Sequence, residues 1–120
     1  MDFGFTEEEK QLRKEVHEFY SKELPADFSG HVPSLGEKVQ SWYLEFQKKA
    51  GKRGYLTAGW PKEYDGLGLG AIAQGVVAEE EGYWKVVWPN LIGIHLAGPA
   101  FLLYGSEEQK KKYIPPMCRG

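Results

Sequence analysis

Residues 98–116 have the sequence GPAFLLYGSEEQKKKYIPP, which predicts a helix, a sharp turn and a short capped helix. Gly105 is expected to end the first helix, and Ser106-Glu107-Glu108-Gln109 forms a capping box that starts the second. Pro115 is expected to end the second helix, and only four residues follow Pro116. A chain that stops just after such a pattern is expected to be one module of a longer protein.

The N-terminal half predicts two further helices. Thr6-Glu7-Glu8-Glu9 is a capping box, and the apolar residues Leu12, Val16, Phe19 and Tyr20 follow it at helical spacing, up to Pro25. Ser34-Leu35-Gly36-Glu37 is a second capping box. It precedes an apolar stripe of Val39, Trp42, Tyr43, Phe46 and Ala50. Gly51 or Gly54 is expected to close that helix.

Residues 54–70 contain five glycines and are expected to form a functional loop, which Tyr55, Trp60, Tyr64 and Leu67 attach to the body. A third helix is expected over residues 71–83. A fourth begins near Pro89 and is apolar nearly all round, which predicts a buried helix. Gly98-Pro99 is expected to start a fifth. No segment alternates with period two, so we expect an all-α bundle of about five or six helices and no sheet.

Composition favours one domain, residues 1–120, with a net charge of −2 and no basic excess for nucleic acid. Cys118 is the only cysteine, which excludes an internal disulfide and fits the cytoplasm. Residues 1–5 lack the features of a signal peptide. Residues 86–106 carry no formal charge, but Pro89 and Pro99 interrupt them, so we expect a buried helix pair rather than a membrane span.

Few residues suggest chemistry by themselves. None of the three histidines has a glutamate three residues before it, so no metal site is expected. The glycines of residues 66–70 lack the preceding strand of a dinucleotide loop and are expected to serve a tight backbone path. Glu79-Glu80-Glu81 is interpreted as a solvated helix face, with a general base as the alternative. His95 is interpreted as a core histidine, with substrate contact as the alternative.

Four segments in order resemble the N-terminal domain of acyl-CoA dehydrogenases, and the resemblance covers essentially the whole chain. The segments are Phe3-x-Phe5-Thr6-Glu7-Glu8 with Leu12-Arg13 and Val16, then Gly59-Trp60-Pro61-Lys62-Glu63-Tyr64-Asp65-Gly66-Leu67-Gly68, then Ala78-Glu79-Glu80, and finally Gly98-Pro99 through Tyr113-Ile114-Pro115.

The resemblance implies a longer flavoprotein of fatty acid metabolism, with a β-barrel-like middle domain and a C-terminal four-helix bundle. It implies flavin adenine dinucleotide (FAD) bound mainly by those other domains. A C-terminal glutamate would take the α-proton of an acyl-CoA, and the β-hydrogen would leave as hydride. No catalytic residue is therefore assigned to this chain, which alone is expected to be inactive. The implied partners are acyl-CoA, an electron-transfer flavoprotein or similar acceptor, and further subunits of a homo- or hetero-oligomer.

The resemblance also places part of the acyl pocket in this chain, at Trp88, Pro89, Ile92 and Leu96 with His95 nearby. Two positions depart from the family. Glu81 stands where many relatives have leucine, and Trp88 lies in a segment bulkier than usual. A tryptophan facing the pocket would shorten it or favour a flat, cyclic acyl group.

Other functions stay open at this point. A related flavin monooxygenase or oxidase can share the fold, because fold alone does not fix a reaction. A non-catalytic partner subunit or a freestanding helical interaction module is the alternative outside enzymes.

Overall fold

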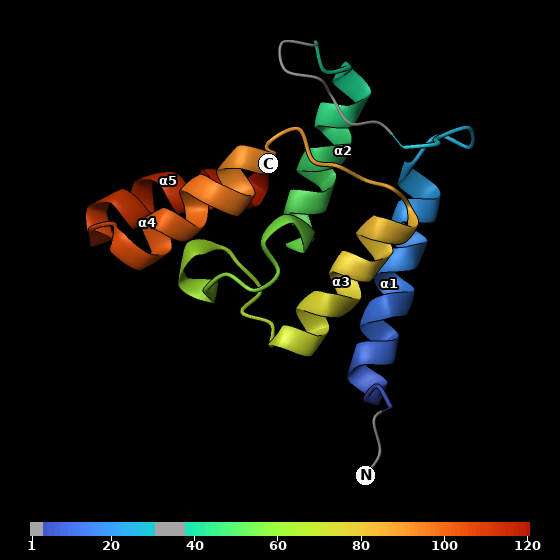
Figure 1. Cartoon of the computed structure of the whole chain (residues 1–120), viewed down its shortest axis with the longest axis horizontal. Helices are drawn as coiled ribbons and strands as arrows, with labels where there is room; N and C mark the ends of the chain where they lie inside the picture. The colour runs from blue at the N-terminus through green and yellow to red at the C-terminus, as the bar shows by residue number, and fades with distance from the viewer. Residues whose placement is uncertain (1–3, 31–37) are drawn as a thin grey trace.

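The computed structural model describes residues 4–30 and 38–120, and these form five α-helices with no strand among them. The predicted all-α class is confirmed (Figure 1). The helices are α1 (Glu7–Glu23), α2 (Ser41–Lys52), α3 (Ala71–Tyr83), α4 (Gly98–Tyr104) and α5 (Glu107–Arg119). Two 3₁₀ turns, η1 (Tyr55–Thr57) and η2 (Lys62–Tyr64), and one π-helical turn, η3 (Gly93–Ala97), connect them. No helix of the described ranges is long and apolar enough to cross a bilayer.

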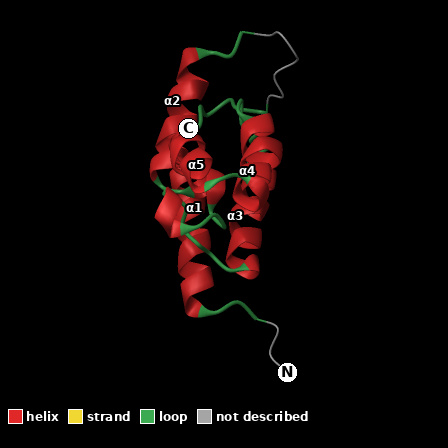
Figure 2. Cartoon of the chain, turned by 90° about the vertical axis from the view of Figure 1, so that its left-hand side faces the viewer, coloured by secondary structure: helices red, strands yellow, loops and turns green. Residues whose placement is uncertain are grey.

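The helices form a thin slab of 43 × 39 × 20 Å, seen edge-on in Figure 2. α1 and α3 run side by side in the same direction, while α4 and α5 form a second pair (Figure 1). The main core lies between α1, α2, η1 and α3. A smaller apolar cluster of Tyr64, Ile114 and Cys118 lies where α5 packs against η2. The slab therefore has two hydrophobic centres rather than one.

Both capping boxes that fall on described residues are formed. At α1, the Thr6 hydroxyl accepts from the Glu9 amide at 3.2 Å and the Glu9 carboxylate accepts from the Thr6 amide at 2.8 Å. At α5, Ser106 and Gln109 make the same reciprocal pair. Because these contacts span only three residues, local sequence determines them.

The start of α2 differs from the prediction. The helix begins at Ser41, after the extended residue Gln40, and Val39 packs on the core from outside it. The predicted capping box at residues 34–37 lies outside the described residues. Gly54, with a φ of +79°, follows the end of the helix in the left-handed region that glycine favours.

The predicted end of α5 at Pro115 is wrong, since the helix continues through Pro115 and Pro116 to Arg119. The two prolines have no amide hydrogen, so the carbonyls of Lys111 and Lys112 lose their helical hydrogen bonds. Both lysines are solvent-exposed, and water can reach their carbonyls. Ile114 and Cys118, four residues apart, are both buried by the same stretch. Apolar burial therefore outweighs the lost hydrogen bonds.

α4 starts at Gly98, as the sequence predicts, but no gap separates it from the turns before it, because residues 91–104 are helical without interruption. The wide η3 turn precedes the proline, and the Gly98 amide bonds to the Gly93 carbonyl five residues back. A π-turn changes the local hydrogen-bond pattern, and here it allows the chain to continue past a proline.

The glycine loop follows the tight path that the sequence predicts. The Gly68 amide donates to the Trp60 carbonyl at 2.8 Å, and the Leu69 amide donates to the Ala58 carbonyl at 2.9 Å. A Cβ on Gly66 would lie 2.1 Å from the Trp60 carbonyl oxygen. Tyr55 and Tyr64 are buried and attach the loop to the body, as expected.

We expect Gly66→Ala to lower the free energy of unfolding by about 1–3 kcal/mol, because the added methyl must push two backbone segments apart. Gly75→Ala is the matched control, since a Cβ at Gly75 in α3 meets nothing within 4 Å and alanine favours a helix. Urea unfolding of both variants tests this. Equal stability of the two variants would contradict the tight loop.

Candidate functional site

The segment between α3 and η3 is held in place by polar side chains of α2. The Tyr43 hydroxyl donates to the Val87 carbonyl at 2.6 Å and accepts from the Val87 amide at 3.0 Å. The Gln47 side-chain oxygen accepts from the Asn90 amide at 3.1 Å. These three bonds fix the backbone on both sides of Trp88.

Trp88 lies in the core, with 3% of its surface exposed. Its ring stacks on Phe46, with centroids 5.2 Å apart, and lies 6.4 Å from the ring of Tyr20. Its indole Nε1 donates to Oε1 of Glu81 at 2.8 Å. A buried indole N–H normally requires such an acceptor, and Glu81 supplies it.

Glu81 is the most strongly perturbed carboxyl among the described residues. Burial raises the pKa of Glu81 to about 6, while the bond from Trp88 and the nearby Tyr20 hydroxyl act in the opposite direction. Burial, followed by the charge of Glu81, raises the pKa of the Tyr20 hydroxyl well above its usual value. That hydroxyl approaches the carboxyl without completing a hydrogen bond. Together these groups form a partly dry polar cluster within an aromatic core.

A cavity of about 260 Å³ adjoins this cluster, between η1, α3 and η3. Its lining includes Thr57 and Trp60 from the glycine-loop side, Glu81 from α3, Trp88, and His95 from η3. The Thr57 hydroxyl is buried, completes no hydrogen bond and lies beside the Cys118 thiol. The cavity thus combines aromatic walls with a small number of polar groups, as ligand sites do.

The helical stretch that follows Trp88 is apolar and open, which corrects the prediction of a buried helix pair. Ile92 and Leu96 are 66% and 67% exposed, and Leu103 and Tyr104 are still more exposed. Of this stretch, Ile94 and Gly98 face inward. Nothing in the described part of the chain covers the other side, because the slab is thin there.

The residues predicted for the acyl pocket therefore fall into two groups. Trp88 and His95 line the cavity, with Trp88 buried and His95 exposed. Ile92 and Leu96 lie on the open face, and Pro89 is half-buried between the two groups. The interpretation of His95 as a core histidine is wrong, because its side chain reaches the surface.

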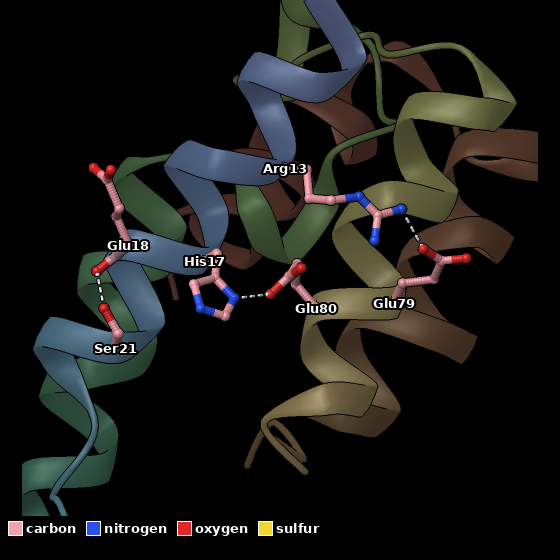
Figure 3. Close-up of polar contacts among 6 residues, drawn as sticks. All are labelled: Arg13, His17, Glu18, Ser21, Glu79 and Glu80. Carbon is pink, nitrogen blue, oxygen red and sulfur yellow. Dashed lines mark hydrogen bonds and ion pairs between the residues drawn. The ribbon is translucent and has the colours of Figure 1, made fainter. Parts of the chain in front are cut away.

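The glutamate run of α3 is only in part the solvated face that the sequence suggests, because Glu79 is exposed, Glu80 is buried and Glu81 is half-buried. Figure 3 shows Arg13 and His17 of α1 directed at Glu79 and Glu80 of α3, with an ion pair between Arg13 and Glu79 and a hydrogen-bond contact between His17 and Glu80. Nδ1 of His17 lies 2.9 Å from Glu80, whose side chain is buried. All three glutamates thus have partners, and each joins α3 to another part of the chain.

Two features of the cavity escaped the sequence analysis: the buried hydroxyl of Thr57 and the bond between Glu81 and Trp88. The departure of Glu81 from the leucine common in relatives was a usable signal, since a carboxyl in a leucine position requires a donor. Thr57 gave no signal. The described ranges contain no group of three or more His, Cys, Asp or Glu side chains placed to hold a metal.

The raised pKa of Glu81 gives a pH dependence of stability. The folded protein holds this proton up to about pH 6, whereas the unfolded chain releases it near pH 4.5. The stability that the proton provides is therefore lost as the pH rises from about 4.5 to 6. We expect the free energy of unfolding to fall by about 2 kcal/mol relative to Glu81→Gln as the pH rises through this window. Urea unfolding from pH 4 to 7.5 measures the difference, and parallel curves would contradict it.

Comparison with known proteins places this geometry in a family. The model of the acyl-CoA dehydrogenase N-terminal domain matches residues 6–120. Acyl-CoA dehydrogenase FadE29 of Mycobacterium tuberculosis (strain ATCC 25618 / H37Rv) is 31% identical over 120 residues, which cover 100% of this chain and 30% of that protein.

Two solved structures have the same fold. The ChsE4-ChsE5 complex from Mycobacterium tuberculosis matches with a TM-score of 0.78 and 26% identity, over 99% of this chain and 29% of that one. The steroid ACAD Tcur3481-Tcur3483 matches with a TM-score of 0.76 and 32% identity, over 99% of this chain and 30% of that one. The chain thus spans less than a third of the length of these relatives, and it belongs to the acyl-CoA dehydrogenase family as an N-terminal helical domain.

Proposed function

We propose that this chain acts within an FAD-dependent enzyme that dehydrogenates an acyl-CoA between its α and β carbons, and that it contributes one wall of the acyl pocket. The observation that carries the proposal is the open apolar face of Ile92 and Leu96 beside the cavity at Trp88. Family membership supplies the reaction class, and this face supplies a surface suited to an acyl chain.

The residues of this wall would act by removing water from the acyl chain. Each buried methylene contributes about 0.8 kcal/mol, so an isoleucine and a leucine side by side give useful affinity without any polar contact. Their position is rigid, because the helix behind them is held by Ile94 in the core. The wall therefore binds and orients the substrate, while proton and hydride transfer belong to groups elsewhere in the proposed enzyme.

The described residues do not by themselves fit FAD. A cavity of about 260 Å³ is below the usual range of sites for whole ligands, about 300–1,000 Å³, and a carboxylate in its lining would repel a pyrophosphate. When bound, the flavin would accept the hydride from the substrate. FAD is accordingly proposed to lie against other parts of the complete protein.

The same proposal extends to partners and location. The matched structure of ChsE4-ChsE5 is a complex of two proteins, which supports assembly of the complete protein with a second subunit or a second copy. We propose an electron-transfer flavoprotein or similar protein as the acceptor. Cys118 is a free, buried thiol, which is compatible with the reducing cytoplasm.

The visible spectrum of the complete protein tests the proposed reaction. We expect a yellow flavin spectrum that bleaches when acyl-CoAs of different length and shape are added without oxygen. A flavin that stays oxidised with every acyl-CoA would favour a monooxygenase or oxidase of the same fold. Absence of flavin would favour a non-catalytic partner subunit. Either result would overturn the proposed dehydrogenase activity.

A single exposed side chain tests the proposed wall. Ile92→Ser in the complete protein is expected to raise KM for acyl-CoA about tenfold, because burial of an isoleucine contributes about 1.5–3 kcal/mol. Ile72→Ser is the matched control, since Ile72 on α3 is 62% exposed and is not part of the cavity lining. Equal KM values for the two variants would contradict a role of this face in substrate binding.

A further inference from the structure

We propose that the cavity between α3 and η3 is a subsite for a hydroxyl-bearing ring at the far end of the acyl group, with Glu81 as the acceptor for that hydroxyl. The inference rests on the proposed function and makes Glu81 a specificity-determining residue.

The first argument is the unused capacity of the Glu81 carboxyl. A carboxylate accepts about four hydrogen bonds through its two oxygens. Here Oε1 accepts one bond, from Trp88 at 2.8 Å, and the Tyr20 hydroxyl stops short of a second. The side chain lines the cavity, so a donor placed there has an acceptor ready.

The second argument is the burial of the Glu81 carboxyl. Burial raises the pKa of Glu81 to about 6, which means that its surroundings supply fewer hydrogen bonds than the charged form requires. A ligand donor in the adjoining cavity would supply one of them.

The third argument is the size and shape of the space. About 260 Å³ equals the liquid volume of roughly nine water molecules, which suits one substituted ring rather than a whole substrate. Trp60 and Trp88 give flat walls, and Val77 and Ile94 give apolar ones. Such walls suit an apolar ring, because the ring leaves water when it enters the cavity.

The cavity also lies where an acyl chain on the proposed wall would arrive. His95 and Pro99 line it, and they belong to the same continuous helix as the exposed Ile92 and Leu96. A chain lying along that helix would therefore run toward the cavity. The walls around Glu81 are apolar, which favours a neutral hydroxyl over an ammonium group, whose desolvation is costly.

The test uses the complete flavoprotein and acyl-CoAs that end in a cyclohexyl ring, in pairs with and without a hydroxyl on carbon 4 of the ring. Linkers of three to eight methylenes cover the possible depths. We expect a kcat/KM ratio of about tenfold or more in favour of the hydroxylated member at one linker length, because hydrogen bonds to charged groups are strong. A wild-type ratio near one at every length overturns the inference without any variant.

Three variants locate the effect. Glu81→Leu is expected to lower the ratio at least tenfold, and Glu81→Gln, which keeps an acceptor for Trp88, is expected to lower it less. Glu79→Leu is the matched control, since Glu79 is the exposed neighbour that pairs with Arg13 and does not line the cavity. A ratio unchanged in both Glu81 variants overturns the role of Glu81. If no acyl-CoA of either kind bleaches the wild-type flavin, the proposed function fails instead.

Discussion

The burial of Trp88 is the constraint on which the other features depend. Its ring completes an aromatic stack with Phe46 of α2, and its N–H requires an acceptor, which Glu81 of α3 provides. Tyr43 and Gln47 of α2 then fix the backbone on both sides of it. Because three segments meet at one indole, the direction of the chain into η3 is determined, and with it the side of the helix that carries Ile92 and Leu96.

Features that depend on neighbouring residues in the sequence were predictable. The caps at Thr6 and Ser106 and the range of α3 follow from contacts within one or two turns, and the structure has them where the sequence places them. The helix through Pro115 was not predictable in this way, since a proline rule considers only the local backbone. There the burial of Ile114 and Cys118 determines that the helix continues, and the residues that bury them come from distant segments.

The candidate site shows the same division. The family resemblance identified Ile92 and Leu96, but the apolar pattern of their helix could not say whether protein or solvent faces them, because periodicity describes a helix and not its surroundings. The unusual residue at Glu81 was visible in the sequence. Its partner Trp88, its neighbour Tyr20 and the cavity beside them were not, since they depend on how the segment after α3 folds back onto α2.

The two separate apolar clusters have a consequence for motion. A slab 20 Å thick is about two helices deep, so α4 and α5 rest mainly on their own small cluster and not on the aromatic core. Regions with fewer buried contacts open at lower free energy than the global unfolding reaction. Amide hydrogens of α4 and α5 should therefore exchange through a local opening of this pair, while those of α1 and α2 wait for global unfolding. Ile92 and Leu96 lie before α4, on the turns that Ile94 holds in the aromatic core, so the proposed pocket wall would stay in place while α4 and α5 open.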